Sequence, residues 1–384
     1  MANKFTMPRT MFTGEGALEA AKDELCGLGN HAFIVTGQSM IRQGQMKVLT
    51  DLLESKNVTA TIFSGIGGEP TDEMIEEGLA KYREAGCDFI IGFGGGSPLD
   101  AAKAVAALVT NPGNIADYNG KIITTPVPPV VEIPSTSGTG SEVTQFTIIS
   151  DTKKGIKMLL KGGVLMPEMA IVDPKFTYQM PKSVTAATGL DALTHAVEAY
   201  TSKKAFPMTD MYAMSAVKKI FEYLPRAYVD GNDLEARREM SEAALEAGIS
   251  FNNSSVTIVH GMSRPIGALF HVPHGISNAM LLKTCLNFAL EGTYERFAAL
   301  ARGIGAAGEE TTDQEAAEAF LESIGKICDI CEVPTLEGYG IDKAAFFARI
   351  DKMAQDAFDS GSPGNTRKNT SVEDMKILYK KLWE

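Results

Sequence analysis

The hydrophobic pattern of this chain changes its period near Pro181, and this change constrains the fold more than any other feature. Before that point, short β-branched and apolar runs alternate with amphipathic stretches such as residues 71–85. This alternation is typical of a parallel sheet whose strands are connected by helices. The predicted strands are residues 31–36, 59–63, 88–93, 130–133 and 169–172.

After Pro181 the strand signals nearly vanish, and helical patterns follow one another. The predicted helices are residues 191–201, 208–224, 233–250, 293–303, 313–328, 341–357 and 371–383. We therefore predict an α/β N-terminal domain with a parallel sheet, residues 1–180, and an all-α C-terminal domain, residues 181–384. No low-complexity linker marks the boundary, so we expect close packing of the two domains and a ligand-binding cleft between them.

The composition excludes several classes of protein. Hydrophobic residues make up 44% of the 384-residue chain and charged residues 22%, which is typical of soluble globular proteins. The net charge is −12 and basic residues form no block, so neither nucleic acid nor a membrane surface is an expected partner. No apolar run reaches the ~18 residues of a membrane span, and the start lacks a signal core. Together with five scattered cysteines, expected to be reduced, this predicts a cytoplasmic protein.

Three of the five histidines and one aspartate follow the spacing of a buried divalent-metal site. Asp191 and His195 stand four residues apart among strong helix formers, so they share one helix face. His260 ends a β-branched run, and His274 lies between Pro273 and Gly275, which predict a helix entry or a sharp turn. Imidazole nitrogens with one carboxylate suit Zn²⁺ or Fe²⁺. For each histidine alone a hydrogen-bonded place in the core is an equal alternative, but the four together favour a metal site.

A glycine-rich loop follows the strand predicted at residues 88–93. Gly94, Gly95 and Gly96 precede Ser97, which we predict to be the N-cap of the next helix. Backbone amides at such a helix N-terminus can bind a phosphate. The loop departs from the usual dinucleotide fingerprint, because Ser97 stands where the last glycine belongs and the loop follows the third strand. Taken alone, a tight turn without a ligand is the main alternative.

A second polar loop, residues 133–144, follows the strand predicted at residues 130–133 and includes Thr136 and Thr139. Its hydroxyls and bare amides can bind phosphates and a nicotinamide carboxamide without adding net charge. Taken alone, this loop is equally consistent with a polar surface turn. Two such loops at strand ends predict a binding site for one long ligand.

Taken together, four segments resemble the iron-containing, or group III, alcohol dehydrogenases: residues 94–103, 135–144, 189–200 and 259–275. The resemblance covers nearly the whole chain. It implies a Rossmann-like domain that binds NAD or NADP, a helical metal-binding domain, and reversible oxidation of alcohols to aldehydes or ketones. It also implies a small alcohol or aldehyde as substrate and a homodimer or larger homo-oligomer as the assembly.

The resemblance also implies roles for individual residues. The metal ligands are Asp191, His195, His260 and His274. The pyrophosphate-binding residues are Gly95, Gly96 and Ser97, and Gly94 of the same loop also belongs to the cofactor site. The other cofactor residues are Asp100, Thr136, Thr139 and, near the ribose, Lys157. His271 is a candidate proton relay, with an equal alternative in which it only orients the metal site.

Two departures from the family pattern bear on specificity. Many relatives carry a second histidine four residues after the one that matches His260, whereas this chain has Arg264. Arginine suits bidentate contact with an oxyanion, so Arg264 is a candidate for binding an anionic aldehyde such as sulfoacetaldehyde or succinic semialdehyde. The alternative is a structural or cofactor-phosphate contact. After the first nucleotide-binding strand, near the ribose, NAD-preferring relatives often carry an aspartate whose carboxylate would repel the 2′-phosphate of NADP. This chain has Gly37 there, so both NAD and NADP are candidate cofactors.

Two other functions compete with the dehydrogenase. A lyase or cyclase related to dehydroquinate synthase also combines a nucleotide and a metal with an α/β domain. The polar loop of residues 133–144, called the threonine loop below, and the pair Asp191 and His195 argue against it. The other alternative is a non-catalytic assembly protein with a structural metal, which a closed four-ligand shell would favour. The identity of the metal, the substrate and the physiological direction stay open at this stage.

Overall fold

The structure is a computed structural model that describes residues 2–384, and its contacts divide the chain into two compact units. The α/β unit is Thr6–Met180. The helical unit is Pro181–Glu384 with the N-terminal residues up to Phe5, whose ring packs against Phe206 and Tyr212 at centroid distances of 6.3 and 6.0 Å. The beginning of the chain therefore leaves the domain predicted for residues 1–180.

Six parallel strands form the sheet of the α/β unit, in the order β1-β8-β5-β4-β2-β3. The strands are β1 (Thr10–Thr13), β2 (His31–Thr36), β3 (Thr59–Phe63), β4 (Phe89–Gly94), β5 (Val130–Pro134) and β8 (Met169–Val172). The predicted parallel α/β fold is confirmed. Strand β1 was not predicted because it has only four residues and lies at the sheet edge, where it pairs with β8 and needs no apolar run.

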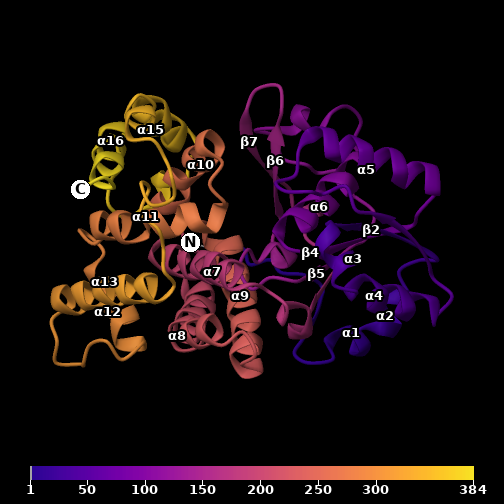
Figure 1. Cartoon of the computed structure of the whole chain (residues 1–384), viewed down its shortest axis with the longest axis horizontal. Helices are drawn as coiled ribbons and strands as arrows, with labels where there is room; N and C mark the ends of the chain where they lie inside the picture. The colour runs from indigo at the N-terminus through magenta and orange to yellow at the C-terminus, as the bar shows by residue number, and fades with distance from the viewer. Residues whose placement is uncertain (1) are drawn as a thin grey trace. The chain divides into compact units, whose positions relative to one another are not determined.

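The two faces of this sheet pack against different helices. Neighbouring side chains of a strand point to opposite faces: Phe33 and Val35 lie in one core, and Ala32 and Ile34 lie in the other. Helices α5 and α6 cover the first face, and α1, α2 and α4 cover the second (Figure 1). The helices of this unit are α1 (Ala17–Ala20), α2 (Lys22–Cys26), α3 (Gln38–Arg42), α4 (Gln45–Glu54), α5 (Asp72–Ala85) and α6 (Gly96–Thr110).

An antiparallel hairpin, which the sequence analysis did not predict, packs beside α6. Strand β6 (Phe146–Asp151) pairs with β7 (Ile156–Lys161). Ile149, Met158 and Leu160 are buried in the core shared with α5 and α6. The other side chains of the two strands are polar, partly buried or exposed, so no continuous buried run identifies the strands from the sequence.

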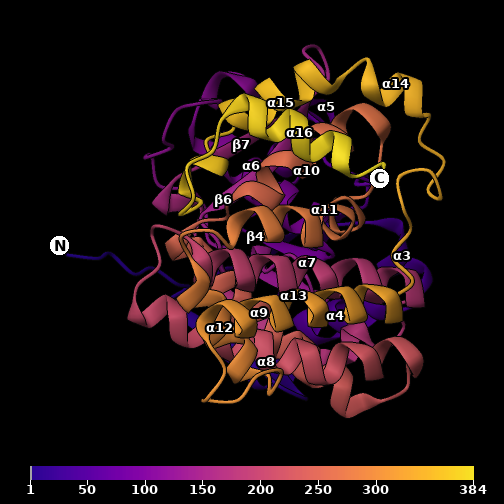
Figure 2. The same ribbon diagram turned by 90° about the vertical axis from the view of Figure 1, so that its left-hand side faces the viewer.

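The helical unit is built around α7, which crosses its middle in Figure 2 and is almost completely buried in its C-terminal half. Helices α8, α9 and α11 pack on it. The bounds are α7 (Lys182–Thr201), α8 (Pro207–Val229), α9 (Leu234–Ser254), α10 (Ile258–Phe270), α11 (His274–Ala289), α12 (Tyr294–Gly303), α13 (Asp313–Ile330), α14 (Lys343–Phe347), α15 (Ile350–Asp359) and α16 (Val372–Lys381). The helix predicted at residues 341–357 is in fact two helices, and α10 and α11 were not predicted.

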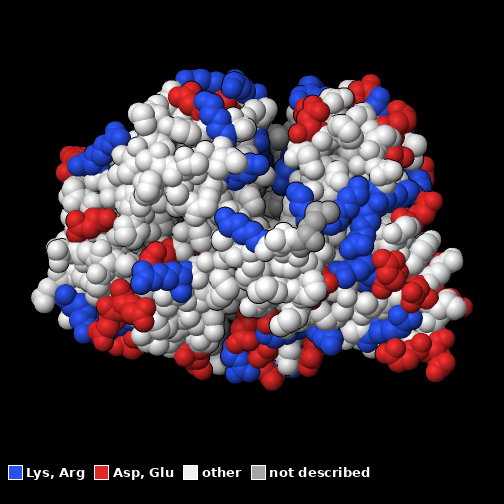
Figure 3. Space-filling model, turned by 180° about the vertical axis from the view of Figure 1, so that it is seen from behind, with Lys and Arg blue, Asp and Glu red and all other residues white. Residues whose placement is uncertain are grey.

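The surface carries charges of both signs. On the face drawn in Figure 3, blue and red side chains lie beside one another over much of the surface. Several form ion pairs, such as Arg226 with Asp233 at 2.9 Å. Within residues 2–384, no helix combines the length and the apolar character that crossing a membrane requires.

Candidate metal centre and nucleotide-binding loops

Three helices of the helical unit bring the four predicted metal ligands together. Asp191 and His195 lie one turn apart on α7. His260 is the third residue of α10, and His274 is the first residue of α11. One possible ligand atom from each residue lies within 4.8 Å of all the others. The structure thus gathers these side chains from segments up to 83 positions apart, counted from 191 to 274.

The spacing of the donor atoms fits a divalent ion. Asp191 Oδ1 lies 3.7 Å from His260 Nε2 and 3.6 Å from His274 Nε2. Donor atoms around a tetrahedral ion, each ~2.1 Å from it, are ~3.4 Å apart. Three of the four ligands are buried, whereas the His274 side chain is 31% exposed. The cluster is therefore partly accessible on the side of His274, and an accessible side is a feature of catalytic metal sites.

Burial shifts the pKa of two of the four ligands, Asp191 and His260. It raises the pKa of Asp191 to about 7, against the hydrogen bond from Asn278, which lowers the pKa. Burial, with the positive charge of Arg264, holds the pKa of His260 well below its usual value. A neutral imidazole keeps a lone pair for a metal, and a dication is the partner that compensates a buried carboxylate. The donor set therefore suits a divalent metal.

Glu198 orients His260, a role that the sequence analysis did not assign. It lies on α7, three residues after His195, and is completely buried. Its Oε2 lies 2.6 Å from His260 Nδ1, while Oε1 accepts hydrogen bonds from Thr257 Oγ1 at 2.7 Å and Val259 N at 2.6 Å. When the Glu198 carboxylate accepts a hydrogen bond from Nδ1–H, the Nε2 atom keeps its lone pair, which faces the other ligands. The sequence signal that could have identified Glu198 is its position, because it is an acidic residue one turn after His195 on a predicted helix.

Helices α7 and α11 approach closely beside His274. A Cβ atom on Gly275 would lie 2.1 Å from the carbonyl oxygen of Ala187, which is closer than atoms can approach. Glycine at this position therefore allows the first turn of α11 to lie against α7. This close approach helps place the His274 imidazole beside Asp191.

The glycine loop of the α/β unit, residues 94–97, gives way to helix α6 two residues earlier than predicted. Gly94 adopts a φ of +149°, and Gly95 is the N-cap of α6, which begins at Gly96. The prediction of Ser97 as N-cap is therefore wrong, because the chain turns within the glycines and leaves Ser97 inside the first turn. The first amides of this 15-residue helix have no partner within the helix, and amides at a helix N-terminus can bind an anion, so the pyrophosphate role stays a prediction.

The glycine loop and the threonine loop contact each other. The amide of Ser135 donates a hydrogen bond to Gly94 O at 2.7 Å. A Cβ on Gly95 would lie 3.4 Å from Thr136 Cγ2, and one on Gly96 would lie 2.7 Å from Thr139 Cγ2. The structure thus places the predicted pyrophosphate-binding amides next to the predicted threonines.

Asp100 connects the threonine loop to the hairpin. Its Oδ1 accepts a hydrogen bond from Ser141 Oγ at 2.5 Å, and its Oδ2 accepts one from Ile148 N at 2.9 Å. Thr147 Oγ1 donates to its backbone carbonyl at 2.7 Å. Both carboxylate oxygens are thus engaged within the unit, so Asp100 shapes the predicted cofactor site through other residues.

Lys103, one turn after Asp100 on α6, was not predicted to matter and is completely buried. Its ammonium donates to the carbonyls of Ser141, of Thr144 at 2.9 Å and of Phe146 at 3.1 Å. It also lies 3.7 Å from a carboxylate oxygen of the buried Glu132. Lys103 therefore holds the C-terminal part of the threonine loop against α6.

The two residues predicted near the ribose lie at different places in the α/β unit. Gly37 follows β2 as the N-cap of α3, and a Cβ there would lie 3.0 Å from Ile66 O. Lys157 lies on β7 and forms an ion pair of 2.5 Å with Glu69. The Lys157 ammonium is thus already paired with an acidic side chain. Any contact of this ammonium with the ribose would have to be made in addition to the ion pair with Glu69.

Arg264 and His271 differ in their relation to the ligand cluster. Arg264 is one turn after His260 on α10, and its Nη1 donates to Ser362 Oγ at 3.0 Å. Its Nε is buried and has no hydrogen-bond partner within residues 2–384. His271 is exposed at the C-cap of α10, with a φ of 54°, and does not belong to the cluster of four.

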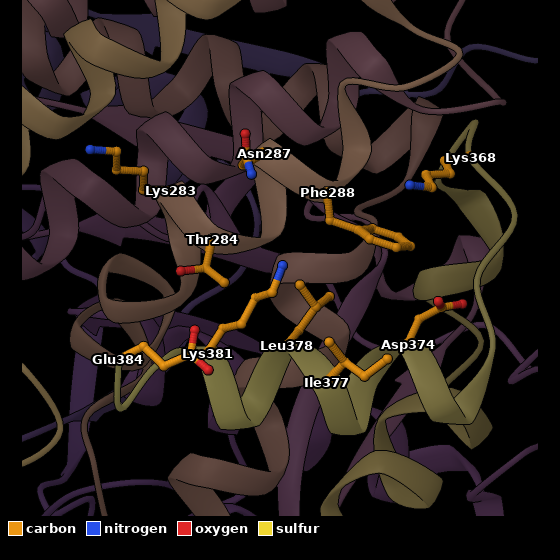
Figure 4. A pocket seen from close by; sticks show the side chains of 10 residues that line it. All are labelled: Lys283, Thr284, Asn287, Phe288, Lys368, Asp374, Ile377, Leu378, Lys381 and Glu384. Atoms are coloured by element: carbon orange, nitrogen blue, oxygen red, sulfur yellow. The ribbon is translucent and has the colours of Figure 1, made fainter.

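A surface pocket of about 600 Å³ lies elsewhere on the helical unit, between α11 and α16 (Figure 4). Its size suits a small ligand. Its three lysines are offset by two acidic side chains, and none of the metal ligands lines it, so we do not place it in the candidate site. Its lining residues are Lys283, Thr284, Asn287, Phe288, Lys368, Asp374, Ile377, Leu378, Lys381 and Glu384.

Comparison with known families covers nearly the entire chain. Residues 8–174 match the family described as iron-containing alcohol dehydrogenase, and residues 185–383 match the C-terminal part of the Fe-containing alcohol dehydrogenase family. The chain belongs to the iron-containing alcohol dehydrogenase family. It is therefore an oxidoreductase that acts on CH–OH groups and uses a nicotinamide cofactor and a divalent metal. This membership favours the dehydrogenase over the lyase and over the non-catalytic assembly protein.

Individual proteins and solved structures align with this chain over almost their full length. The chain is 34% identical to the NADPH-dependent butanol dehydrogenase of Clostridium saccharobutylicum, over 98% of this chain and 97% of that protein. It superimposes on the crystal structure of a 1,3-propanediol oxidoreductase with a TM-score of 0.94, 32% identity and full coverage of both chains. The sulfoacetaldehyde reductase of Bifidobacterium kashiwanohense, solved with NAD⁺, gives a TM-score of 0.89 and 28% identity over 100% of this chain and 99% of that chain.

Proposed function

We propose that this iron-containing alcohol dehydrogenase interconverts a short-chain alcohol and its aldehyde. In this proposal the α/β unit binds NAD or NADP, and the divalent ion, Fe²⁺ or Zn²⁺, is held by Asp191, His195, His260 and His274. The observation that carries the proposal is the cluster of these four side chains within 4.8 Å, buried on all but the His274 side. Such a site combines tight metal binding with access for a substrate oxygen.

Each part of the site has a defined task in the proposed reaction. When bound, the ion acts as a Lewis acid on the substrate oxygen, and the nicotinamide exchanges a hydride with the substrate carbon. Glu198 fixes the ring of His260 through the 2.6 Å contact with Nδ1. The amides at Gly95 and Gly96 bind the pyrophosphate at the positive end of α6. His271 is our candidate for passing the hydroxyl proton to solvent, because its side chain is exposed at the end of α10.

A substrate panel tests the proposed activity. Purified protein loaded with Fe²⁺ or Zn²⁺ is mixed with NADH or NADPH and a series of neutral and anionic short-chain aldehydes. We expect oxidation of the nicotinamide with at least one aldehyde, and the reverse reaction with the matching alcohol. Absence of turnover with every aldehyde, for protein that demonstrably contains metal, would contradict the proposal.

We propose further that the substrate carries an anionic group, for which Arg264 is the binding residue. Arg264 lies one turn from His260 on α10, and its charge acts on that histidine. Only one side-chain contact, with Ser362, is formed, and Nε has no partner within residues 2–384. The guanidinium therefore has donors left for a carboxylate or sulfonate, the group that distinguishes sulfoacetaldehyde, substrate of the similar reductase, from neutral aldehydes.

Replacing Arg264 with alanine is expected to lower kcat/KM for sulfoacetaldehyde or succinic semialdehyde by roughly ten- to a hundredfold. A lost charge-assisted hydrogen bond costs ~1.5–3 kcal/mol. The kcat/KM of this variant for propanal should fall much less, because propanal carries no anionic group. Steady-state kinetics on both aldehydes check this, with Arg264→Lys as the variant that keeps the charge but loses the planar fork. Equal losses on both substrates would assign Arg264 to the cofactor or to the fold.

Replacing Gly37 with aspartate is expected to reduce kcat/KM with NADPH more than with NADH. A carboxylate at this position would repel a 2′-phosphate if the ribose lies at the end of β2. The new Cβ would meet Ile66 O at 3.0 Å, so a small local shift accompanies the change. Gly37→Ala introduces the same Cβ without the charge and serves as control. An unchanged ratio of the two efficiencies would show that the ribose binds elsewhere.

We propose that the enzyme works in the cytoplasm as a homodimer or larger homo-oligomer. All five cysteines are free thiols, which suits a reducing compartment. The family resemblance is the support for the assembly. Light scattering of the purified protein measures the mass of the assembly directly, and a monomer at working concentrations would contradict this part of the proposal.

A further inference from the structure

Asn278 lies among the metal ligands, although no sequence pattern singled it out. It lies on α11, one turn after His274, and is completely buried. Its Nδ2 lies 2.7 Å from Asp191 Oδ1 and 3.2 Å from the Nε2 atoms of both His260 and His274. One amide NH₂ group thus contacts three of the four residues that we assign to the metal.

The two ends of the Asn278 amide have unequal surroundings. Nδ2 has three neighbouring acceptors for its two hydrogens, whereas the buried Oδ1 accepts no hydrogen bond within residues 2–384. A buried carbonyl oxygen without a donor is unfavourable, and native proteins seldom retain one without a further partner. A half-turn of the amide about its Cβ–Cγ bond exchanges the two ends and brings Oδ1 to face the same ligand atoms.

The charge within the cluster determines which end of the amide is favoured. When no cation neutralises the Asp191 carboxylate, a hydrogen-bond donor is needed beside it, and the NH₂ group supplies that donor. When a dication lies among the four ligands, their lone pairs point to the ion and the NH₂ hydrogens are repelled by it. The amide oxygen is then attracted instead, and asparagine oxygens are ordinary ligands of divalent cations.

We propose that Asn278 is a fifth group of the metal centre, and that its side-chain amide turns over when the divalent ion binds, so that Oδ1 faces the ion. With the NH₂ group inward, it holds Asp191, His260 and His274 together before the ion arrives. With the oxygen inward, it contributes to binding the ion. This inference rests on the proposed assignment of the ion to the four ligands.

Three variants separate the two tasks of Asn278. Asn278→Asp keeps the shape but offers only oxygens, so it can contact the ion but cannot donate to Asp191. Asn278→Leu can do neither. Asn287→Asp adds the same charge on the surface of the same helix, in the pocket away from the ligands, and is the matched control. Each protein is stripped with a chelator, and its Zn²⁺ affinity is measured by competition with a chromophoric chelator, alongside thermal unfolding with and without Zn²⁺.

The proposal predicts opposite effects of the two Asn278 variants on metal affinity. Asn278→Asp is expected to bind Zn²⁺ about tenfold or more tightly than the wild type, and to unfold at a lower temperature once stripped, because two carboxylates then face each other. Asn278→Leu is expected to bind Zn²⁺ about 10- to 100-fold more weakly. Asn287→Asp should match the wild type in both measurements.

Cobalt provides a readout that does not depend on activity or on stability. If Oδ1 joins the four ligands, Co²⁺ in the wild type should absorb visible light more weakly than a four-coordinate site, and Asn278→Leu should restore the stronger absorption. Wild-type affinity in both variants with an unchanged cobalt spectrum, or weaker Zn²⁺ binding by Asn278→Asp, would overturn the proposal for Asn278. Failure of the wild type itself to bind Zn²⁺ would instead overturn the four-ligand assignment and, with it, this inference.

Discussion

Replacing His260 with alanine is expected to remove most of the bound metal and to lower kcat/KM by at least about 10³-fold. Electrophilic stabilisation by a metal contributes several kcal/mol to the transition state, and each 1.36 kcal/mol is tenfold in rate. His260 is central because Glu198 fixes its ring and because burial keeps it neutral. Metal content measured by mass spectrometry and steady-state kinetics together check this expectation.

His31→Ala is the control for the His260 variant. His31 lies on β2 in the α/β unit, where its Nε2 contacts Thr61 Oγ1 at 2.9 Å. It should therefore keep the metal content of the wild type. If the His260 variant retained both full metal and full activity, the ligand assignment would be wrong, whereas loss of metal in both variants would indicate general unfolding.

Lys103→Met is expected to lower the free energy of unfolding by about 3–5 kcal/mol, the usual cost of removing one partner of a buried ionic network. The ammonium donates to three carbonyls and lies 3.7 Å from Glu132. Burial raises the pKa of Glu132 well above its usual value, and Lys103 opposes that rise. Without the ammonium, these carbonyls lose their donor and the carboxyl loses its counter-charge.

Urea denaturation monitored by circular dichroism measures the effect of the Lys103 variant, and Glu132→Gln is its matched partner. The glutamine removes the charge but leaves the lysine's hydrogen bonds to the carbonyls of Ser141, Thr144 and Phe146, so we expect a clearly smaller loss of stability. Dinucleotide affinity should fall in Lys103→Met as well, because the threonine loop would no longer be fixed to α6. Wild-type stability of Lys103→Met would show that the loop is held by other contacts.

The sequence allowed prediction of those features that depend on local periodicity. The strands that became β2, β3 and β8 were predicted at their observed bounds. Strands β2 and β8 are apolar runs buried in the sheet, whereas β3, at the sheet edge and partly exposed, was recognised from its β-branched and aromatic residues. The pairing of Asp191 with His195 followed from the helical repeat alone. Their association with His260 and His274 was a hypothesis from residue type and spacing, and the resemblance to a family implied the same four residues. No local pattern indicates which distant helices will pack together.

The features that escaped prediction depend on partners far away in the sequence. Asp100 was assigned to the cofactor, yet its carboxylate binds Ser141 and Ile148, more than 40 positions later in the chain. Lys103 looked like an ordinary residue of a predicted helix, and Asn278 lay in a segment for which no helix was predicted. Their roles arise only when the helices and loops are packed. Such polar contacts leave no periodic trace in the sequence, because a single side chain is enough to form them.

Metal titration of the stripped enzyme tests the central claim most directly. Protein freed of metal with a chelator is given increasing amounts of Fe²⁺ or Zn²⁺, and the oxidation of the nicotinamide is followed with the best aldehyde from the panel. We predict that the stripped wild type is inactive, that activity rises in proportion to bound ion and levels off at one ion per chain, and that the His260→Ala variant is not restored. Full activity in wild-type protein that holds no divalent metal by mass spectrometry would contradict the claim.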